Sequence, residues 1–90
     1  METGENRLKR LRMRSWRRGT KEMDLILGPY ADARLAELAP EVLDLYEELL
    51  DENDQDLYLW ISGVGGAPAR HGEIITHIRR FHGIAGEPGH

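Results

Sequence analysis

The sequence predicts an all-α fold in one small domain, from three observations. Its length of 90 residues is typical of a single domain. Apolar residues recur at helical spacing in five separate segments, with glycine or proline near most of their ends. No segment shows the apolar and polar alternation of a half-buried strand. We expect a helical core over residues 6–83 and flexible tails at residues 1–5 and 84–90.

The first predicted helix begins at about Asn6 and carries most of the basic residues. At 100° per residue, five arginines share one of its faces. This arginine ridge consists of Arg7, Arg10, Arg14, Arg17 and Arg18. Leu8, Leu11 and Trp16 form a narrow apolar seam on the other side, and we place Trp16 in the core. Because like charges on one helix face repel, we expect the exposed ridge to bind something.

Gly19 is predicted to end the first helix, since glycine is unfavourable in a helix interior but suits a turn. Thr20 or Gly19 can then cap a second helix. Its core contacts are predicted to come from Met23, Ile26 and Leu27. The dipeptide Gly28-Pro29 predicts the end of this helix. A connector follows over residues 30–38, with a short helix from Ala31 to Leu38.

A third helix is predicted from Pro40 to Leu50, because proline suits the first helical position. Its core stripe is Val42, Leu45, Tyr46, Leu49 and Leu50. After an acidic turn, Asp54 is predicted to cap a short helix from Gln55 to Ser62. The inward residues of that helix are Leu57, Trp60 and Ile61.

The last predicted helix runs from Gly72 to His82 and ends at Gly83. Its core residues are Ile74, Ile75, Ile78 and Phe81. Three histidines lie in or beside this segment, and their spacing does not place a metal-binding pair on one helix face. We therefore expect His71, His77 and His82 to lie at the surface.

Charge is strongly segregated along the chain. Residues 1–22 contain eight Lys or Arg and three Glu, a net charge of +5. Residues 23–62 contain one Arg and eleven acids, a net charge of −10. These regions can attract each other inside the fold or present two differently charged faces to a partner.

Composition and motifs exclude several classes of function. With no cysteine, the chain has no disulfide and no thiolate metal site. No nucleophile motif is present, and no carboxylate lies in an apolar setting suited to acid–base catalysis, so we expect no enzyme. The acidic turn 51–54 lacks the pattern of a calcium loop, and the glycine-rich loop 63–70 lacks that of a phosphate loop. We predict no metal site and no tightly bound cofactor.

The N-terminal region lacks the apolar stretch of a signal peptide, and no apolar run is long enough to span a membrane. We therefore expect a bacterial cytoplasmic protein, rather than one of the mitochondrial matrix, without a membrane partner. The composition favours a small helical module that binds another protein. The alternative is a nucleic-acid-binding module that uses the arginine ridge. The acidic middle region would be repelled by phosphates and counts against it.

The junction between the first two helices resembles a known family. Arg18 to Glu22 contains the pattern Arg-Gly-x-x-Glu, the hallmark of the FAD assembly factors of succinate dehydrogenase and their mitochondrial relatives. A second signature of that family is Leu-Leu, an acidic turn and Asp-Leu-aromatic-x-Trp, and it stands at residues 49–60. The resemblance covers about residues 7–82. One departure is Thr20, where several relatives carry an apolar residue.

The resemblance implies a five-helix fold and the role of an assembly factor, or chaperone. Such a factor binds the flavoprotein subunit of succinate dehydrogenase, and of the related fumarate reductase, and promotes covalent FAD attachment (flavinylation). That bond joins the 8α carbon of the flavin to a histidine of the flavoprotein. The cofactor and the histidine therefore belong to the partner, and whether the factor touches FAD directly stays open.

The partner-binding residues implied by the resemblance are Arg14, Arg17, Arg18, Gly19 and Glu22, with Asp24 in support. Gly19 would let the partner backbone approach closely. Arg18 would bind a carboxylate or carbonyl groups of the partner. Glu22 would orient Arg18 or accept a hydrogen bond from the partner. The remaining arginines would extend the contact and steer the encounter.

Overall fold

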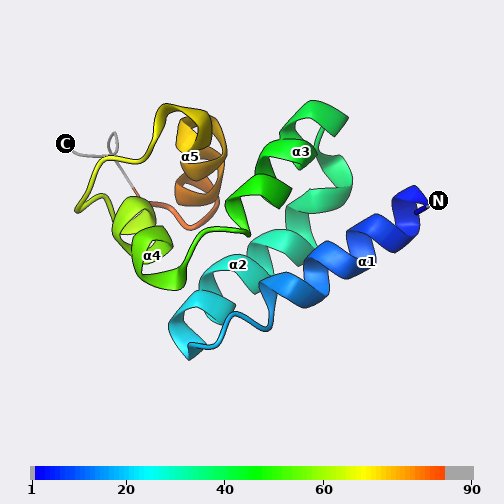
Figure 1. Ribbon diagram of the computed structural model, residues 1–90, viewed down its shortest axis with the longest axis horizontal. Coiled ribbons are helices and arrows are strands. Elements are labelled where there is room, and N and C mark those ends of the chain that lie inside the picture. Colours follow the sequence, from blue (N-terminus) through cyan, green and yellow to red (C-terminus); the bar gives the residue numbers. More distant parts are fainter. Residues whose placement is uncertain (1, 85–90) are drawn as a thin grey trace.

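The computed structural model describes residues 2–84, which form five α-helices and two short 3-10 helices (Figure 1). In chain order these are α1 (Gly4–Ser15), α2 (Lys21–Arg34), η1 (Leu35–Glu37), α3 (Pro40–Leu49), α4 (Asp54–Ser62), η2 (Ala69–His71) and α5 (Gly72–Phe81). No strand occurs within the described range. The predicted all-α, five-helix fold is confirmed.

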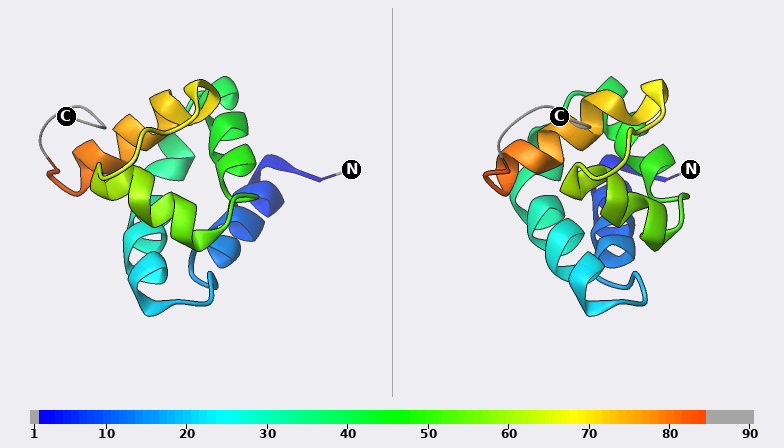
Figure 2. Two further views of the ribbon diagram at one scale, coloured as in Figure 1. Left: turned by 60° about the vertical axis from the view of Figure 1, so that its left-hand side comes forward. Right: turned by 90° about the vertical axis from the view of Figure 1, so that its left-hand side faces the viewer.

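The helices enclose one apolar core. α1 lies along α2, and α4 and α5 lie together at the other end of the molecule (Figure 1). The buried apolar side chains include Leu11, Met23, Leu27, Tyr30, Leu35, Tyr46, Leu49, Leu57, Ile61, Ile74, Ile75 and Ile78. The loop between α1 and α2 projects at one extremity of the molecule, as both views in Figure 2 show. This loop contains the Arg-Gly part of the motif.

α1 begins and ends earlier than the sequence indicates. The side chain of Thr3 accepts a hydrogen bond from the Asn6 amide at 3.1 Å, so Gly4 and Glu5 are helical and the predicted tail 1–5 is too long. At the other end, helix geometry stops at Ser15, whose hydroxyl lies 2.6 Å from the Tyr46 hydroxyl in the core. The tail predicted at residues 84–90 falls, apart from residue 84, outside the described residues.

α2 continues through Gly28 and Pro29, so the predicted stop and the separate connector are wrong. Glycine lacks the Cβ that would clash before proline, which removes part of the usual steric objection to a helix there. Burial of Tyr30 and Ala31 beyond the proline stabilises the added turn. Gly28 is also required for packing, because a Cβ at this position would lie 2.3 Å from the Trp16 ring. Trp16 packs against α2 at the surface and stays 39% exposed, so the prediction that it lies in the core is wrong.

α3 and α5 match their predicted ranges to within one residue. In α4, by contrast, the cap is Asn53 and not Asp54, because the Asn53 side chain accepts from the Asp56 amide at 2.9 Å. Asp54 is therefore inside the first turn, and its carboxylate is available for another contact. Trp60 is half-buried against the core, as predicted.

One of the three histidines contradicts the predicted surface position. His71 is buried, its Nε2 lies 2.8 Å from a Glu52 carboxylate oxygen, and its ring packs near Trp60. His82 is exposed and its ring nitrogen lies 2.6 Å from the Ile26 carbonyl oxygen. The partly buried pair of His71 and Glu52 anchors the acidic turn between α3 and α4 to the start of α5.

No helix of the described part of the chain is long and apolar enough to cross a membrane.

Candidate functional site

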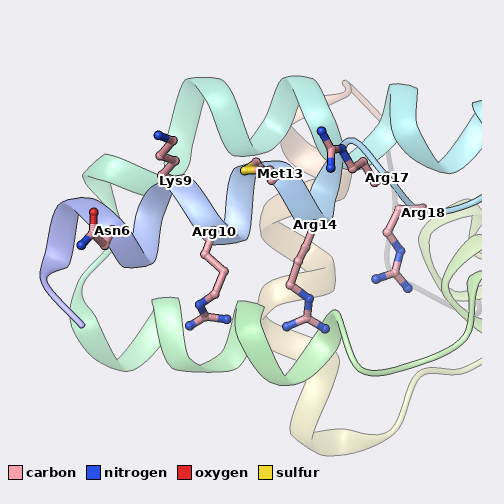
Figure 3. Close-up of a pocket in the computed structure, with 7 residues that line it drawn as sticks. All are labelled: Asn6, Lys9, Arg10, Met13, Arg14, Arg17 and Arg18. Atoms are coloured by element: carbon pink, nitrogen blue, oxygen red, sulfur yellow. The ribbon is translucent and has the colours of Figure 1, made fainter. Parts of the chain in front are cut away.

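Most side chains of the arginine ridge are paired with carboxylates of the same chain. Arg7 contacts Asp44 at 2.6 Å and Glu47 at 3.0 Å. Arg10 contacts Glu47 at 2.9 Å, and Arg14 contacts Asp51 at 3.0 Å. Figure 3 shows Arg10 and Arg14 pointing toward α3, whereas Lys9 points away from it.

The segregated charges of the sequence therefore attract each other inside the fold. The basic face of α1 lies against the acidic side of α3, across 37 to 40 residues of sequence. The hydrogen bond with Asp44 raises the pKa of Arg7, and the one with Arg10 lowers the pKa of Glu2. Each exposed pair of this kind contributes about 0.2–1 kcal/mol, so the row helps to set the α1–α3 register more than it stabilises the fold.

Arg18 is the most buried cation of the predicted site, with a side chain 10% exposed. Its Nε donates to Asp54 at 2.8 Å. Its two terminal nitrogens donate to the backbone carbonyls of Leu50 and Glu52, both at 2.7 Å. Three of its five N–H donors are engaged within the chain, so at most two remain for a partner, and the predicted role of Arg18 in partner binding stays a prediction.

The position of Arg18 has a clear physical reason. The last carbonyls of a helix have no partner within the helix, and they carry partial negative charge. Arg18 supplies donors to the Leu50 carbonyl at the C-cap of α3 and to the Glu52 carbonyl in the following turn, and it places a positive charge beside Asp54 at the start of α4. Its own backbone amide donates to Asp24 at 2.7 Å. Arg18 and Asp24 together fix the shape of the α1–α2 loop, whereas a supporting role of Asp24 in partner binding stays a prediction.

Gly19 follows at φ +105°, a conformation that residues with a Cβ rarely adopt. It is exposed, and a Cβ there would meet only the Asp54 carboxylate, at 3.8 Å. The loop backbone is therefore open to solvent at this point. This openness is the property that the resemblance requires of Gly19, although binding through it stays a prediction.

Glu22 lies in the first turn of α2 with its side chain in solvent. Within residues 2–84 it makes no hydrogen bond or ion pair. The prediction that Glu22 orients Arg18 is not supported, since Asp54 and two carbonyls hold that side chain. The two ends of the motif thus have different surroundings. Arg18 is used internally, and Glu22 is available to a partner.

A shallow groove adjoins Glu22, between α2 and α4. It is lined by Thr20, Glu22, Met23, Asp54, Gln55, Tyr58 and Leu59. Tyr58 is 48% exposed and Leu59 is 43% exposed, which is unusual for two large apolar side chains side by side in sequence. The groove therefore combines an apolar wall with a free carboxylate and the open Gly19–Thr20 backbone, a surface suited to binding protein.

Sequence reasoning did not single out Tyr58 and Leu59. A signal for them was present, because both fall off the inward stripe formed by Leu57, Trp60 and Ile61. Residues 49–60 carry the second family signature, and the structure brings this segment to the Arg-Gly motif through Arg18. The two signatures therefore form one site.

Arg17 is the predicted site arginine that stays in solvent, and it has no ion pair or hydrogen-bonding partner for its side chain in the described region. Arg14 is partly exposed but contacts Asp51. No group of three or more His, Asp or Glu among the described residues is placed to hold a metal ion. The hollows of this surface are open, and the nucleic-acid alternative loses most of its ridge to the carboxylates of the chain itself.

The family model and the most similar curated proteins point to the same family. The family described as "Flavinator of succinate dehydrogenase" matches residues 9–82. A succinate dehydrogenase assembly factor 2-B of Drosophila mojavensis is 34% identical over 80 residues, which cover 87% of this chain and 51% of that protein. An assembly factor 2 of Meyerozyma guilliermondii is 44% identical over 59 residues, covering 66% and 44%.

A third relative, from Aspergillus terreus, is 47% identical over 51 residues, covering 57% of this chain and 17% of that protein. This chain thus spans about half or less of these curated relatives. All three are named as mitochondrial proteins, so the expectation of a bacterial cytoplasmic location is wrong by this comparison, which points to the mitochondrion. No solved structure matches the chain.

The relatives are named as assembly factors and not as enzymes, in agreement with the prediction of a non-enzymatic chain. The matched region contains both signatures and every residue that forms the groove. By sequence match over most of its length, the chain belongs to the succinate dehydrogenase flavinator family.

Proposed function

We propose that this chain binds the flavoprotein subunit of succinate dehydrogenase and promotes covalent attachment of FAD to it. The observation that carries the proposal is the free carboxylate of Glu22, next to the open Gly19 backbone and an apolar groove, in a chain of the flavinator family. A related fumarate reductase flavoprotein is a second expected client.

The chain acts by holding its partner, without supplying a catalytic group. Attachment requires a histidine of the flavoprotein to meet the flavin in reacting geometry. A bound factor that favours this arrangement raises the fraction of time spent there, and with it the rate. FAD stays with the flavoprotein in this scheme, and the factor needs no tightly bound cofactor.

Each part of the site has a distinct task. Arg18 and Asp24 fix the loop, so that little conformational entropy is lost when the partner binds. Gly19 permits close approach of the partner backbone. Glu22 accepts a hydrogen bond or pairs with a cation, and Tyr58 supplies apolar contact area with a polar end.

The test uses cells that lack their own factor, with covalent flavin fluorescence of the flavoprotein read on a denaturing gel. The native chain is expected to restore the band. Glu22→Gln is expected to weaken flavoprotein binding by roughly 10-fold or more, because a charge-assisted hydrogen bond contributes about 1.5–3 kcal/mol. Lys21→Gln is the control, since Lys21 is exposed, adjacent and not part of the groove. Full restoration by Glu22→Gln together with Tyr58→Ala would exclude the groove as the docking site.

Two variants of Gly19 separate the effect of backbone strain from that of steric obstruction of the partner. Gly19→Ala and Gly19→Arg both place a Cβ at φ +105°, so both share the backbone strain. Only the arginine adds bulk above the loop. We expect similar melting temperatures for the two but a much weaker flavin band for Gly19→Arg. Equal bands would mean that close approach at Gly19 is not needed.

A further inference from the structure

We propose that the side of α1 turned away from α3 is a second docking surface, which receives an acidic segment of the flavoprotein. This open face consists of Asn6, Lys9, Met13, Trp16 and Arg17. The inference rests on the proposed function for the identity of the partner. It concerns residues outside the groove and outside the Arg-Gly-x-x-Glu pattern.

The open face presents cations that the fold does not neutralise. Lys9 and Arg17 are exposed, and neither has an ion pair or a side-chain hydrogen bond within the described residues. Figure 3 shows both pointing away from α3, with Met13 between them. Lys9 and Met13 are four residues apart on α1, and Arg17, just beyond the helix end, lies on the same side, so the three form one strip (Figure 3).

Two hollows flank this strip and share its residues. One is lined by Asn6, Lys9, Arg10, Met13, Arg14, Arg17 and Arg18, and the other by Glu5, Asn6, Leu8, Lys9, Arg12, Met13, Trp16, Arg17 and Ala36. Glu5 is the only acid in either lining, and it lies at the helix start. Met13 is 43% exposed, so the cations stand beside apolar surface. Such a strip fits carboxylates carried on a partly apolar segment.

The opposite side of α1 indicates which kind of partner segment would fit the open face. There, the acidic helix α3 lies against α1 and contributes Asp44 and Glu47, and the turn after α3 contributes Asp51. The open face has Glu5 at its start and Asp32 hydrogen-bonded to the Trp16 ring nitrogen. Its two cations, Lys9 and Arg17, however, pair with no carboxylate of the described residues. An acidic helix or extended segment of the partner would complete the arrangement.

Nucleic acid is the less fitting occupant. Phosphate binding gains from many free cations, and this face offers two along its strip, with Arg12 at its margin. The other arginines of α1 are already paired with carboxylates. The whole chain carries a net charge of −4, which repels a polyanion.

The test measures the association rate constant of the purified flavoprotein subunit with the chain at several salt concentrations. Lys9→Glu and Arg17→Glu are compared with Arg80→Glu, an exposed α5 residue for which the net charge changes equally. We expect the first two to slow association about 10-fold at low salt, with the difference lost at high salt. Arg80→Glu should remain within twofold of the native chain. Melting temperatures confirm that the variants fold.

The results distinguish failure of this inference from failure of the proposed function. If Glu22→Gln weakens binding but Lys9→Glu and Arg17→Glu behave like Arg80→Glu, the open face is not a docking surface while the proposed function stands. If the native chain does not bind the flavoprotein at all, both are overturned. If Lys9→Glu reduces salt-dependent binding of a short DNA duplex but not of the flavoprotein, the occupant is nucleic acid and the inference fails.

Discussion

The two sides of α1 differ in what the fold places opposite them. On one side, Arg7 and Arg10 meet carboxylates of α3, and Arg14 meets Asp51 in the turn that follows it. Arg18 continues the row beyond the helix end, where its side chain is 10% exposed. On the other side, Lys9 and Arg17 remain in solvent beside Met13 and Trp16. We call these the paired side and the open face.

This comparison shows that residue type and position on the helix do not reveal whether a basic side chain is paired within the fold or available to a partner. Arg17 and Arg18 are neighbours in sequence, yet Arg18 makes three side-chain hydrogen bonds and Arg17 is free within the described residues. Substitutions on the paired side should therefore change stability, and those on the open face should change binding. Four predictions test this difference.

Arg18→Ala is expected to have the largest effect on stability. It leaves Asp54 and two carbonyls without their donors, and breaking a buried ion pair costs about 3 kcal/mol or more. Arg17→Ala is the matched control and should change the free energy of unfolding by less than about 0.5 kcal/mol. Urea unfolding followed by circular dichroism measures both. Equal losses would remove the distinction between the two sides.

The next largest loss of stability is expected at alkaline pH, through the buried tyrosines of the core beneath the paired side. Burial raises the pKa of Tyr30 from 10.0 to about 12, and burial also raises the pKa of Tyr46. The unfolded phenols ionise near pH 10 while the folded ones do not, so this contribution is complete below pH 10 and is lost as pH rises toward 12. The loss from Tyr30 alone approaches roughly 2–3 kcal/mol, and Tyr46 adds to it.

The measurement is tyrosinate absorbance alongside circular dichroism. In a Tyr58→Phe variant only Tyr30 and Tyr46 remain as phenols. Their ionisation should then coincide with loss of helical signal. Ionisation well before unfolding would show that these hydroxyls are not protected by the core.

Gly28→Ala should destabilise the chain by about 2 kcal/mol, because its methyl group would overlap the Trp16 ring at the edge of the open face. The same substitution in a Trp16→Ala background should cost less, since the obstructing ring is gone. Thermal unfolding of the four variants of this cycle gives the coupling. A coupling near zero would mean that the close packing of Trp16 on Gly28 is absent in solution.

The smallest stability effect is expected for Arg7, an exposed end of the paired side. Arg7→Gln removes the contacts to Asp44 and Glu47 and should cost about 0.5–1 kcal/mol at low salt. Because salt screens such pairs, the cost should shrink at 1 M salt. Lys9→Gln on the open face should show no comparable dependence. A salt-independent loss for Arg7→Gln would point to packing of its aliphatic stem as the cause.

The sequence by itself determined the fold class, the limits of α3 and α5, and most of the core. These depend on helical periodicity and on local start and stop signals, which are written within one or two turns of chain. The break at Gly19 was likewise readable, because glycine is favoured where the backbone turns to positive φ. The motif also marked a region that has an exposed glycine and an unpaired carboxylate, and its role in binding stays a prediction.

Only the tertiary structure decided which side chains of that region are free. The stop at Gly28-Pro29 was overridden by burial beyond the proline and by the packing of Trp16, neither of which is a local property. Arg18 was assigned to a partner because its own partners lie 32 to 36 residues away. Local pattern fixes which face of a helix a charge occupies, but its energy depends on the charge opposite, and that is set only when the helices pack.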